Sequence, residues 1–176
     1  MAATVDISET NGTFAASVET VDISNLNLGS DDSAELVPAT YPITAQVDGH
    51  SFEKWIRYRV SALGGSSQID NLKVWKSSGA YKTEEGVSTN ARLSGYSAAT
   101  YPNPGPPIET DSAVATQVMP VAEPAGPNIG IAGSLSGIIT TVTSYSDWLV
   151  IQQDVTENTP AGSLNTKVYT FQYDEQ

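Results

Sequence analysis

Alternation of apolar and polar residues recurs in short stretches along this chain, and it is clearest in residues 52–62 and 69–76. In each of these stretches one face is apolar, and the opposite face combines tryptophan with cations. The apolar faces hold Ile56, Tyr58 and Val60 in the first stretch, and Leu72 and Val74 in the second. A period of two residues is that of a half-buried strand, and residues 64–67 between the stretches read Gly-Gly-Ser-Ser. We therefore predict a hairpin here.

Weaker versions of the same pattern predict further strands. Residues 4–8, Thr-Val-Asp-Ile-Ser, recur as residues 20–24, and the pair Asn11-Gly12 between them favours a turn. We also expect strands at 42–48, 138–143, 148–155 and 164–173. The stretch 148–155 is nearly continuously apolar at its start, as in a strand buried on both faces, and the last stretch sets three aromatic residues on one face.

The proline distribution interrupts this series of strands. Seven of the ten prolines fall within residues 101–128, where missing amide hydrogens exclude a central strand. We expect an extended excursion that still packs, with either a strand or a turn of helix near 113–119. About ten short strands with turns between them favour a single all-β domain over residues 1–176. Its predicted fold is an antiparallel, jelly-roll-like β-sandwich with a Pro-rich extended excursion.

Charge and composition narrow the classes of partner. The net charge is −12, and the first 53 residues contain nine acids and no Lys or Arg. An acidic chain repels phosphate backbones, so nucleic-acid binding is disfavoured. No stretch has the length of a membrane span, and the N-terminus lacks the basic start and apolar run of a secretion signal. The absence of cysteine excludes disulfides and thiolate chemistry.

No pattern in the sequence predicts catalysis, a cofactor or a metal. His50 is the only histidine, and its place after the turn pair Asp48-Gly49 is typical of an exposed residue. A serine elbow, a Walker loop, a dinucleotide fingerprint and a zinc-protease motif are all missing from the sequence. Twenty acids always allow some pairing, so carboxylate chemistry stays formally open. We expect a protein that is not an enzyme and has no catalytic, cofactor-binding or metal-binding residues.

The polar faces of the two clearest strands are the candidate interface. Seven of the eight basic residues lie between Lys54 and Arg92. Tryptophan beside arginine is the composition of binding hot spots, so one interpretation is contact with an acidic neighbour or a second copy. A second interpretation packs both tryptophans under the Pro-rich segment, with the basic stems over them. A third is sugar stacking. The candidate residues are Trp55, Arg57, Arg59, Lys73 and Trp75.

The C-terminal third resembles an ending found in small structural proteins of tailed bacteriophages. The similarity rests on residues 146–152, Ser-Asp-Trp-Leu-Val-Ile-Gln, on the turn 159–162, Thr-Pro-Ala-Gly, and on residues 169–175, Tyr-Thr-Phe-Gln-Tyr-Asp-Glu. Residues 54–58 and 69–75 are similar to the central hairpin of such proteins. Together these segments cover under half of the chain, and they carry no catalytic residue.

This resemblance implies a non-catalytic virion component, assembled in the host cytoplasm. The first expectation is a capsid decoration or cement protein that stabilises joints between capsid subunits. Its partners would be the major capsid protein or other virion proteins, and it would form a homo-oligomer, with a trimer favoured. The alternative is a neck, tail or baseplate accessory protein, or a carbohydrate-binding adhesin.

Overall fold

The protein folds as two antiparallel β-sheets, packed face to face. The computed structural model describes residues 1–102, 107–162 and 164–176, and these ranges contain no α-helix. Within them no helix is long and apolar enough to cross a membrane. The elements are β1 (Thr4–Asn11), the 3-10 helix η1 (Phe14–Ala16), β2 (Val18–Thr20), β3 (Gly49–His50), β4 (Lys54–Ala62), β5 (Ile69–Ser78), β6 (Glu85–Thr89), β7 (Gln117–Val118), β8 (Leu149–Val155) and β9 (Val168–Glu175).

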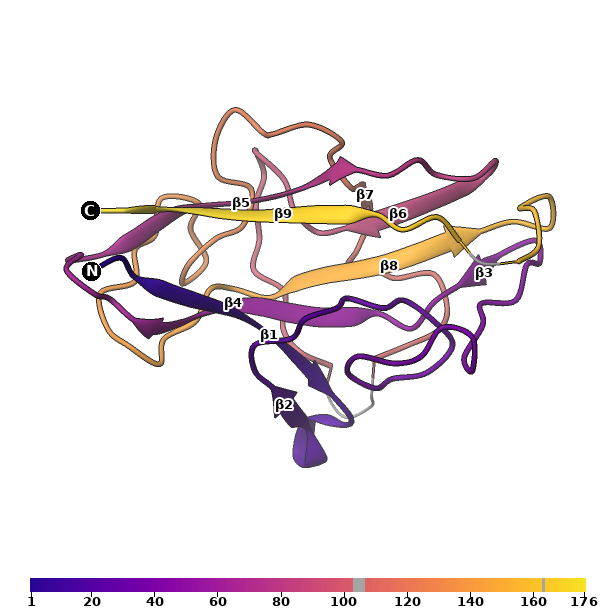
Figure 1. Ribbon diagram of the computed structural model, residues 1–176, viewed down its shortest axis with the longest axis horizontal. Coiled ribbons are helices and arrows are strands. Elements are labelled where there is room, and N and C mark those ends of the chain that lie inside the picture. The colour runs from indigo at the N-terminus through magenta and orange to yellow at the C-terminus, as the bar shows by residue number, and fades with distance from the viewer. Residues whose placement is uncertain (103–106, 163) are drawn as a thin grey trace.

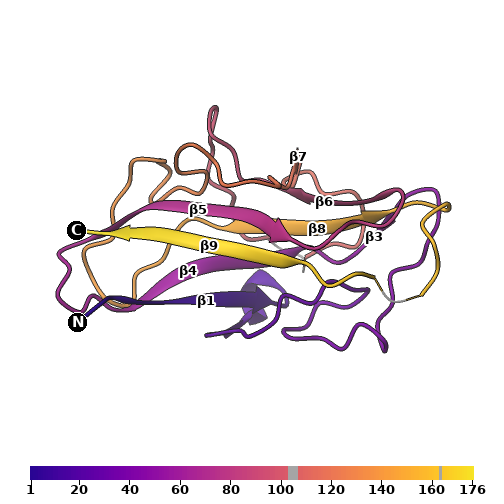
Figure 2. The same cartoon turned by 45° about the horizontal axis from the view of Figure 1, so that its top comes forward.

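Seven strands form the larger sheet, in the order β2-β1-β4-β8-β6-β7, with β3 also paired to β8. Strands β5 and β9 form the smaller sheet and lie side by side in both ribbon views (Figures 1 and 2). All pairings are antiparallel, so the predicted all-β antiparallel sandwich is confirmed. A division into seven and two strands does not confirm a jelly roll, which has eight strands in two Greek keys.

The main core lies between the two sheets. Ile56, Tyr58 and Val60 of β4 face Leu72 and Val74 of β5, and all five side chains are at most 1% exposed. The hydroxyl of Tyr58 donates a hydrogen bond across this core to the backbone carbonyl of Lys73. Aromatic contacts add to the packing, because the ring centroid of Tyr58 lies 5.7 Å from that of Phe171 in an edge-to-face arrangement.

The predicted hairpin of residues 52–62 and 69–76 is wrong, although both strands exist. Strand β4 pairs with β1 and β8, whereas β5 pairs with β9, so the chain crosses from one sheet to the other between them. Two strands with one apolar face each bury those faces equally well as neighbours or as opposite layers. Alternation alone therefore predicted the strands but not their pairing.

Other predicted strands differ from the structure in instructive ways. Residues 42–48 and 138–143 form no strand, apart from an isolated bridge between Ile139 and Ile69. Residues 20–24, the second copy of the repeat, do not form the predicted strand. Strand β2 ends at Thr20, because Asp22 has a φ of 55° and turns the chain. The β1–β2 hairpin around Asn11-Gly12 is confirmed. Strand β6 was not predicted, because its inward-facing side chains include a glutamate and a threonine.

The described part of the Pro-rich segment contributes to both cores. Tyr101 and Ala115 are buried against Trp55 on the outer face of the larger sheet, whereas Met119, which is 1% exposed, belongs to the main core. The short β7 is the edge strand of the sheet, which is the place that proline-rich sequence tolerates. It settles the open choice near 113–119 in favour of a strand. Residues 103–106 of the predicted excursion lie outside the described residues.

Candidate functional site: an apolar groove beside β9

The five predicted interface residues do not share one surface. Because β4 and β5 belong to opposite sheets, Trp55, Arg57 and Arg59 lie on the outer face of one sheet, and Lys73 and Trp75 lie on the outer face of the other. The surface predicted from a two-stranded ribbon is therefore absent from the described residues.

Trp55 belongs to a second core and not to the surface. It is 1% exposed, its ring centroid lies 5.4 Å from that of Tyr101, and its indole N–H donates to Glu53 at 2.9 Å. Packing under the Pro-rich segment, the second interpretation of this residue, is thus the observed one. An exposed Trp55, which partner contact or sugar stacking would need, is contradicted. Trp75 is half-buried on β5 and stays a candidate for contact.

The cations of the predicted interface are paired within the chain. Arg57 binds Glu19 at 2.9 Å, and its guanidinium carbon lies 3.6 Å from the centroid of the Tyr145 ring. Burial raises the pKa of Glu19, but hydrogen bonds from Ser8 and Arg57 outweigh it and leave that pKa below its usual value. Salt bridges also occupy the other two cations, Arg59–Asp6 at 3.4 Å and Lys73–Glu123 at 2.8 Å.

His50 is not the exposed residue that its turn position predicted. It lies in β3, its side chain is 13% exposed, and its Nδ1 is 3.0 Å from Asp154. The hydroxyl of Ser88 also donates to Asp154, at 2.5 Å. A serine nucleophile must contact the histidine, whereas here both contact the carboxylate, so the three residues do not have the order of a catalytic triad.

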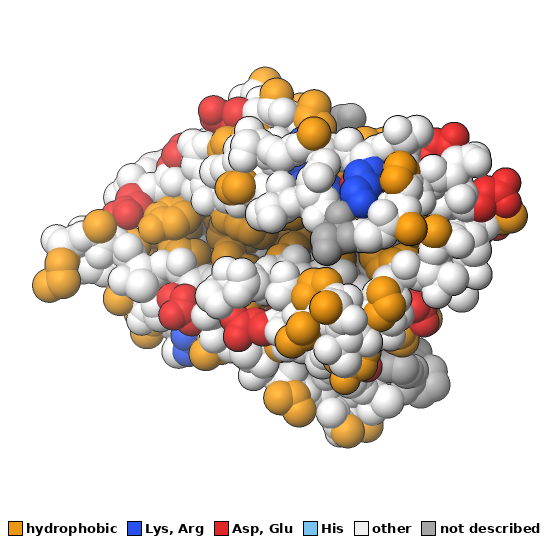
Figure 3. All heavy atoms as spheres, turned by 45° about the vertical axis from the view of Figure 1, so that its right-hand side comes forward, with side chains coloured by type: hydrophobic (Ala, Val, Ile, Leu, Met, Phe, Trp, Pro, Cys, Tyr) orange, Lys and Arg blue, Asp and Glu red, His pale blue; other side chains and the backbone are white. Residues whose placement is uncertain are grey.

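A groove of about 920 Å³ opens between the two sheets at one side of the sandwich. The larger sheet contributes Ile7, Ile56 and Val155 to its lining. The space-filling view shows hydrophobic side chains gathered in this hollow (Figure 3). Such a volume lies in the range of ligand sites, so this groove is a candidate binding surface.

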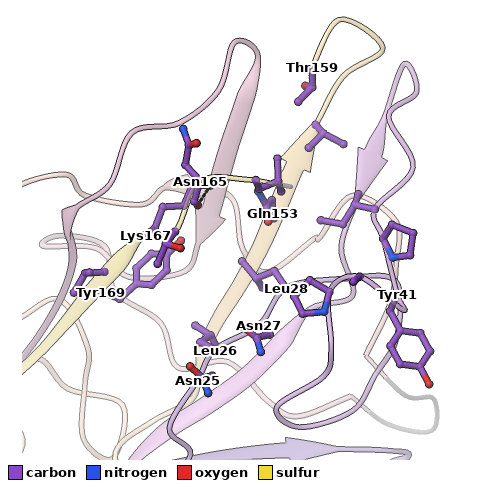
Figure 4. A pocket seen from close by; sticks show the side chains of 18 of the residues that line it. Asn25, Leu26, Asn27, Leu28, Tyr41, Gln153, Thr159, Asn165, Lys167 and Tyr169 are labelled. Atoms are coloured by element: carbon purple, nitrogen blue, oxygen red, sulfur yellow. Dashed lines mark hydrogen bonds between the residues drawn. The ribbon is translucent and has the colours of Figure 1, made fainter. Parts of the chain in front are cut away.

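The two walls of the groove come from opposite ends of the chain. Segment 23–28 and residues 38–45 form one wall. Residues 159–162 and 164–169 form the other, together with Phe171 of β9. Figure 4 shows Leu26 and Leu28 on one side, and Tyr169 and Lys167 on the other. The backbone N–H of Ile23 donates to the carbonyl of Ile7 at 3.0 Å, which ties the first wall to the part of β1 that does not pair with β2.

Strand β9 brings an unpaired edge to this groove. Within the described residues β9 pairs only with β5, so its other edge has no strand beside it. Its aromatic residues Tyr169, Phe171 and Tyr173 share one face, as predicted, and they are only partly buried against the core. A long edge without lysine or proline along 168–173 is a template for adding another strand.

The groove is nearly free of charge, although the chain is strongly acidic. None of its described lining residues is acidic, and Lys167 is the one cation among them. Lys167 binds the buried Glu85, which also accepts a hydrogen bond from Gln153 at 2.5 Å. Burial and the neighbouring Glu85 raise the pKa of Tyr81 to about 12, and burial raises that of Tyr169 as well. Both phenols therefore stay neutral at physiological pH.

The described residues contain no group of three or more His, Cys, Asp or Glu side chains arranged to hold a metal ion. The groove offers apolar area, a few amides and backbone edge groups, which suit binding and not acid–base chemistry. Sequence reasoning missed this site. The one signal was the aromatic face of residues 169–173. No family model, no curated protein and no solved structure matches the chain.

Proposed function

We propose that this protein is a non-catalytic structural component of a phage virion, and that it binds an extended, uncharged segment of a neighbouring virion protein in its groove. The resemblance of the C-terminal third to small structural proteins of tailed bacteriophages supports a place in the virion. The groove beside the unpaired edge of β9 is the observation that supports the mode of binding. The preferred role in the virion is that of a capsid decoration or cement protein, and the alternative is that of a neck or tail accessory protein.

Strand addition suits the geometry of the groove. Residues Val168 to Phe171 present about 13 Å of strand edge, at about 3.3 Å per residue. A partner strand there would gain backbone hydrogen bonds from β9, and its alternate side chains would cover Ile7 and Ile23. The partly buried apolar residues along this edge would then become fully buried.

Charge favours a neutral segment as the occupant. At a net charge of −12, two copies of this chain repel each other, and an acidic partner would be repelled too. The lining of the groove contributes no acid to that repulsion. An uncharged arm therefore binds without burying an unpaired carboxylate.

A pair of matched valine variants tests the proposal. Val168 is 50% exposed and lines the groove, whereas Val142 is 49% exposed and does not line it. We expect Val168→Lys to reduce co-sedimentation of the purified protein with virus particles that lack it at least tenfold, because a lysine on an edge blocks strand pairing. Val142→Lys should co-sediment normally, and both variants should melt like the parent.

Two results would contradict the proposal. Failure to find the protein in purified particles by mass spectrometry removes the virion setting. Equal co-sedimentation of the two variants removes the groove as the binding site. Sedimentation velocity of the free protein checks the expected homo-oligomer separately, because a trimer formed without particles must use contacts between copies.

A further inference from the structure

Three side chains of strands β1 and β4 meet at a site where Glu9 and Lys54 are fully buried and Asn11 is partly buried. The Nζ of Lys54 lies 2.7 Å from Oε1 of Glu9, and both side chains have no exposed area. The side-chain amide of Asn11 donates to the same oxygen at 2.9 Å. One carboxylate oxygen thus contacts both a primary amine and a carboxamide nitrogen.

The strand register explains why these three groups meet. Glu9 lies opposite Ile56, and Thr10 lies opposite Trp55, so the next step of the ladder sets Asn11 opposite Lys54. Glu9 and Asn11 are two residues apart and share a face. Asp32 holds the amide of Asn11 from the other side, with its Oδ1 2.8 Å from Nδ2.

Burial makes the charged form of this pair costly. Removing an ammonium and a carboxylate from water is repaid only when all their hydrogen-bonding capacity is used. Oε2 of Glu9 is buried without a hydrogen-bond partner. Transfer of one proton from Lys54 to Glu9 neutralises both groups and leaves a free amine, which is the nucleophilic form of lysine.

We propose that Lys54 and Asn11 join spontaneously in an isopeptide bond, with Glu9 carrying the protons. Glu9 takes a proton from Nζ, and the free amine attacks Cγ of Asn11. Glu9 then passes the proton to Nδ2, the bond between Cγ and Nδ2 breaks, and ammonia leaves. The remaining amine proton returns through Glu9 to the ammonia, which departs as ammonium. An amine and a carboxamide become a secondary amide, so the step needs no oxidant and no co-reactant.

Contact of Glu9 with both nitrogens carries this inference. The amine must lose a proton and the amide nitrogen must gain one, and a single oxygen lies within 3 Å of each. The product replaces a buried ion pair with a neutral amide and ties β1 covalently to β4. It would give a chain without cysteine a cross-link that reducing agents do not break.

A second trio offers an internal comparison. Glu85 accepts a hydrogen bond from Gln153 and binds Lys167. This trio therefore also combines a carboxylate, a carboxamide and a lysine. Lys167, however, precedes β9 and lines the open groove, outside any strand ladder. Lys54 and Asn11 are held in place by two paired strands, and they are the residues to which we assign the bond.

Mass spectrometry of the purified full-length protein tests the proposal. We expect an intact mass below the sequence mass by one ammonia. No Lys or Arg precedes Lys54, so trypsin normally releases the peptide that ends there. An amidated Lys54 resists cleavage, and the first tryptic peptide should run to Arg57. The variants Glu9→Gln, Lys54→Met and Asn11→Ala should each restore the sequence mass, whereas the control Lys167→Met should keep the loss.

Several outcomes would overturn the proposal. A parent protein at its sequence mass excludes the bond outright, whatever the variants do. Loss of ammonia that persists in Lys54→Met identifies a succinimide at Asn11-Gly12, which needs no lysine. Loss of water mapped to Glu9, or loss of ammonia mapped to Gln153 and Lys167, places the chemistry elsewhere. The inference does not depend on the proposed groove function.

Discussion

Replacement of Trp55 by alanine should destabilise the free protein severely. The side chain is 1% exposed, so truncation removes a fully buried indole and leaves a cavity between the sheet and the Pro-rich segment. Substitutions of this kind cost about 3–5 kcal/mol. Lost edge-to-face contacts with Tyr101 and Trp148 and the lost hydrogen bond to Glu53 place Trp55→Ala in the upper part of that range.

The matched control is Trp75→Ala. Trp75 is half-buried on the outer face of β5, so its truncation should cost about 1 kcal/mol. For Trp55→Ala, a cost of about 4–5 kcal/mol at roughly 2–4 °C per kcal/mol for a chain of this size should lower the Tm by roughly 8–20 °C.

Urea unfolding followed by far-UV circular dichroism measures both variants. A lower midpoint with an unchanged slope identifies a loss of stability and not a change in the unfolded chain. Equal midpoints for Trp55→Ala and Trp75→Ala would refute the argument, because they would mean that the buried Trp55 contributes no more to the free energy of unfolding than the half-buried Trp75.

Two further predictions concern buried polar groups. Tyr58→Phe should cost about 1–3 kcal/mol in urea unfolding, because the buried carbonyl of Lys73 loses its donor; an unchanged midpoint would show that this bond contributes nothing. The lowered pKa of Glu19 means that its ion pair with Arg57 stabilises the fold above about pH 4.5 and is lost as pH falls through the lowered pKa. Glu19→Gln should therefore unfold with a weaker dependence on pH between 5 and 3 than the parent, and an identical pH profile would contradict this.

Local patterns in the sequence were enough to identify strands but not their neighbours. The side-chain pattern of a strand depends only on whether each of its two faces meets water or the core, which is a local property. This is why apolar residues alternate with polar ones, or run continuously, in residues 52–62, 69–76 and 148–155. Which strand lies beside β5 depends on the C-terminal β9, nearly a hundred residues away. The false hairpin followed from taking chain neighbours as sheet neighbours.

The candidate site was harder to predict than the fold for the same reason. A groove exists because, among the described residues, β9 has a strand beside only one of its two edges, and such a gap is a property of the whole assembly of strands. Cations that were grouped by sequence, such as Arg57 and Lys73, turned out to neutralise acids of their own chain. Their partners, Glu19 and Glu123, lie far away in the sequence.

Both ends of the chain emerge from the same end of the sandwich (Figure 1). The amide of Ala3 donates to Glu175 at 3.0 Å, while the loop 159–162 that lines the groove lies at the far end. A fluorescent protein or affinity handle fused to either end would therefore project away from the groove. A short peptide could join the two ends, which makes the molecule a natural subject for circular permutation.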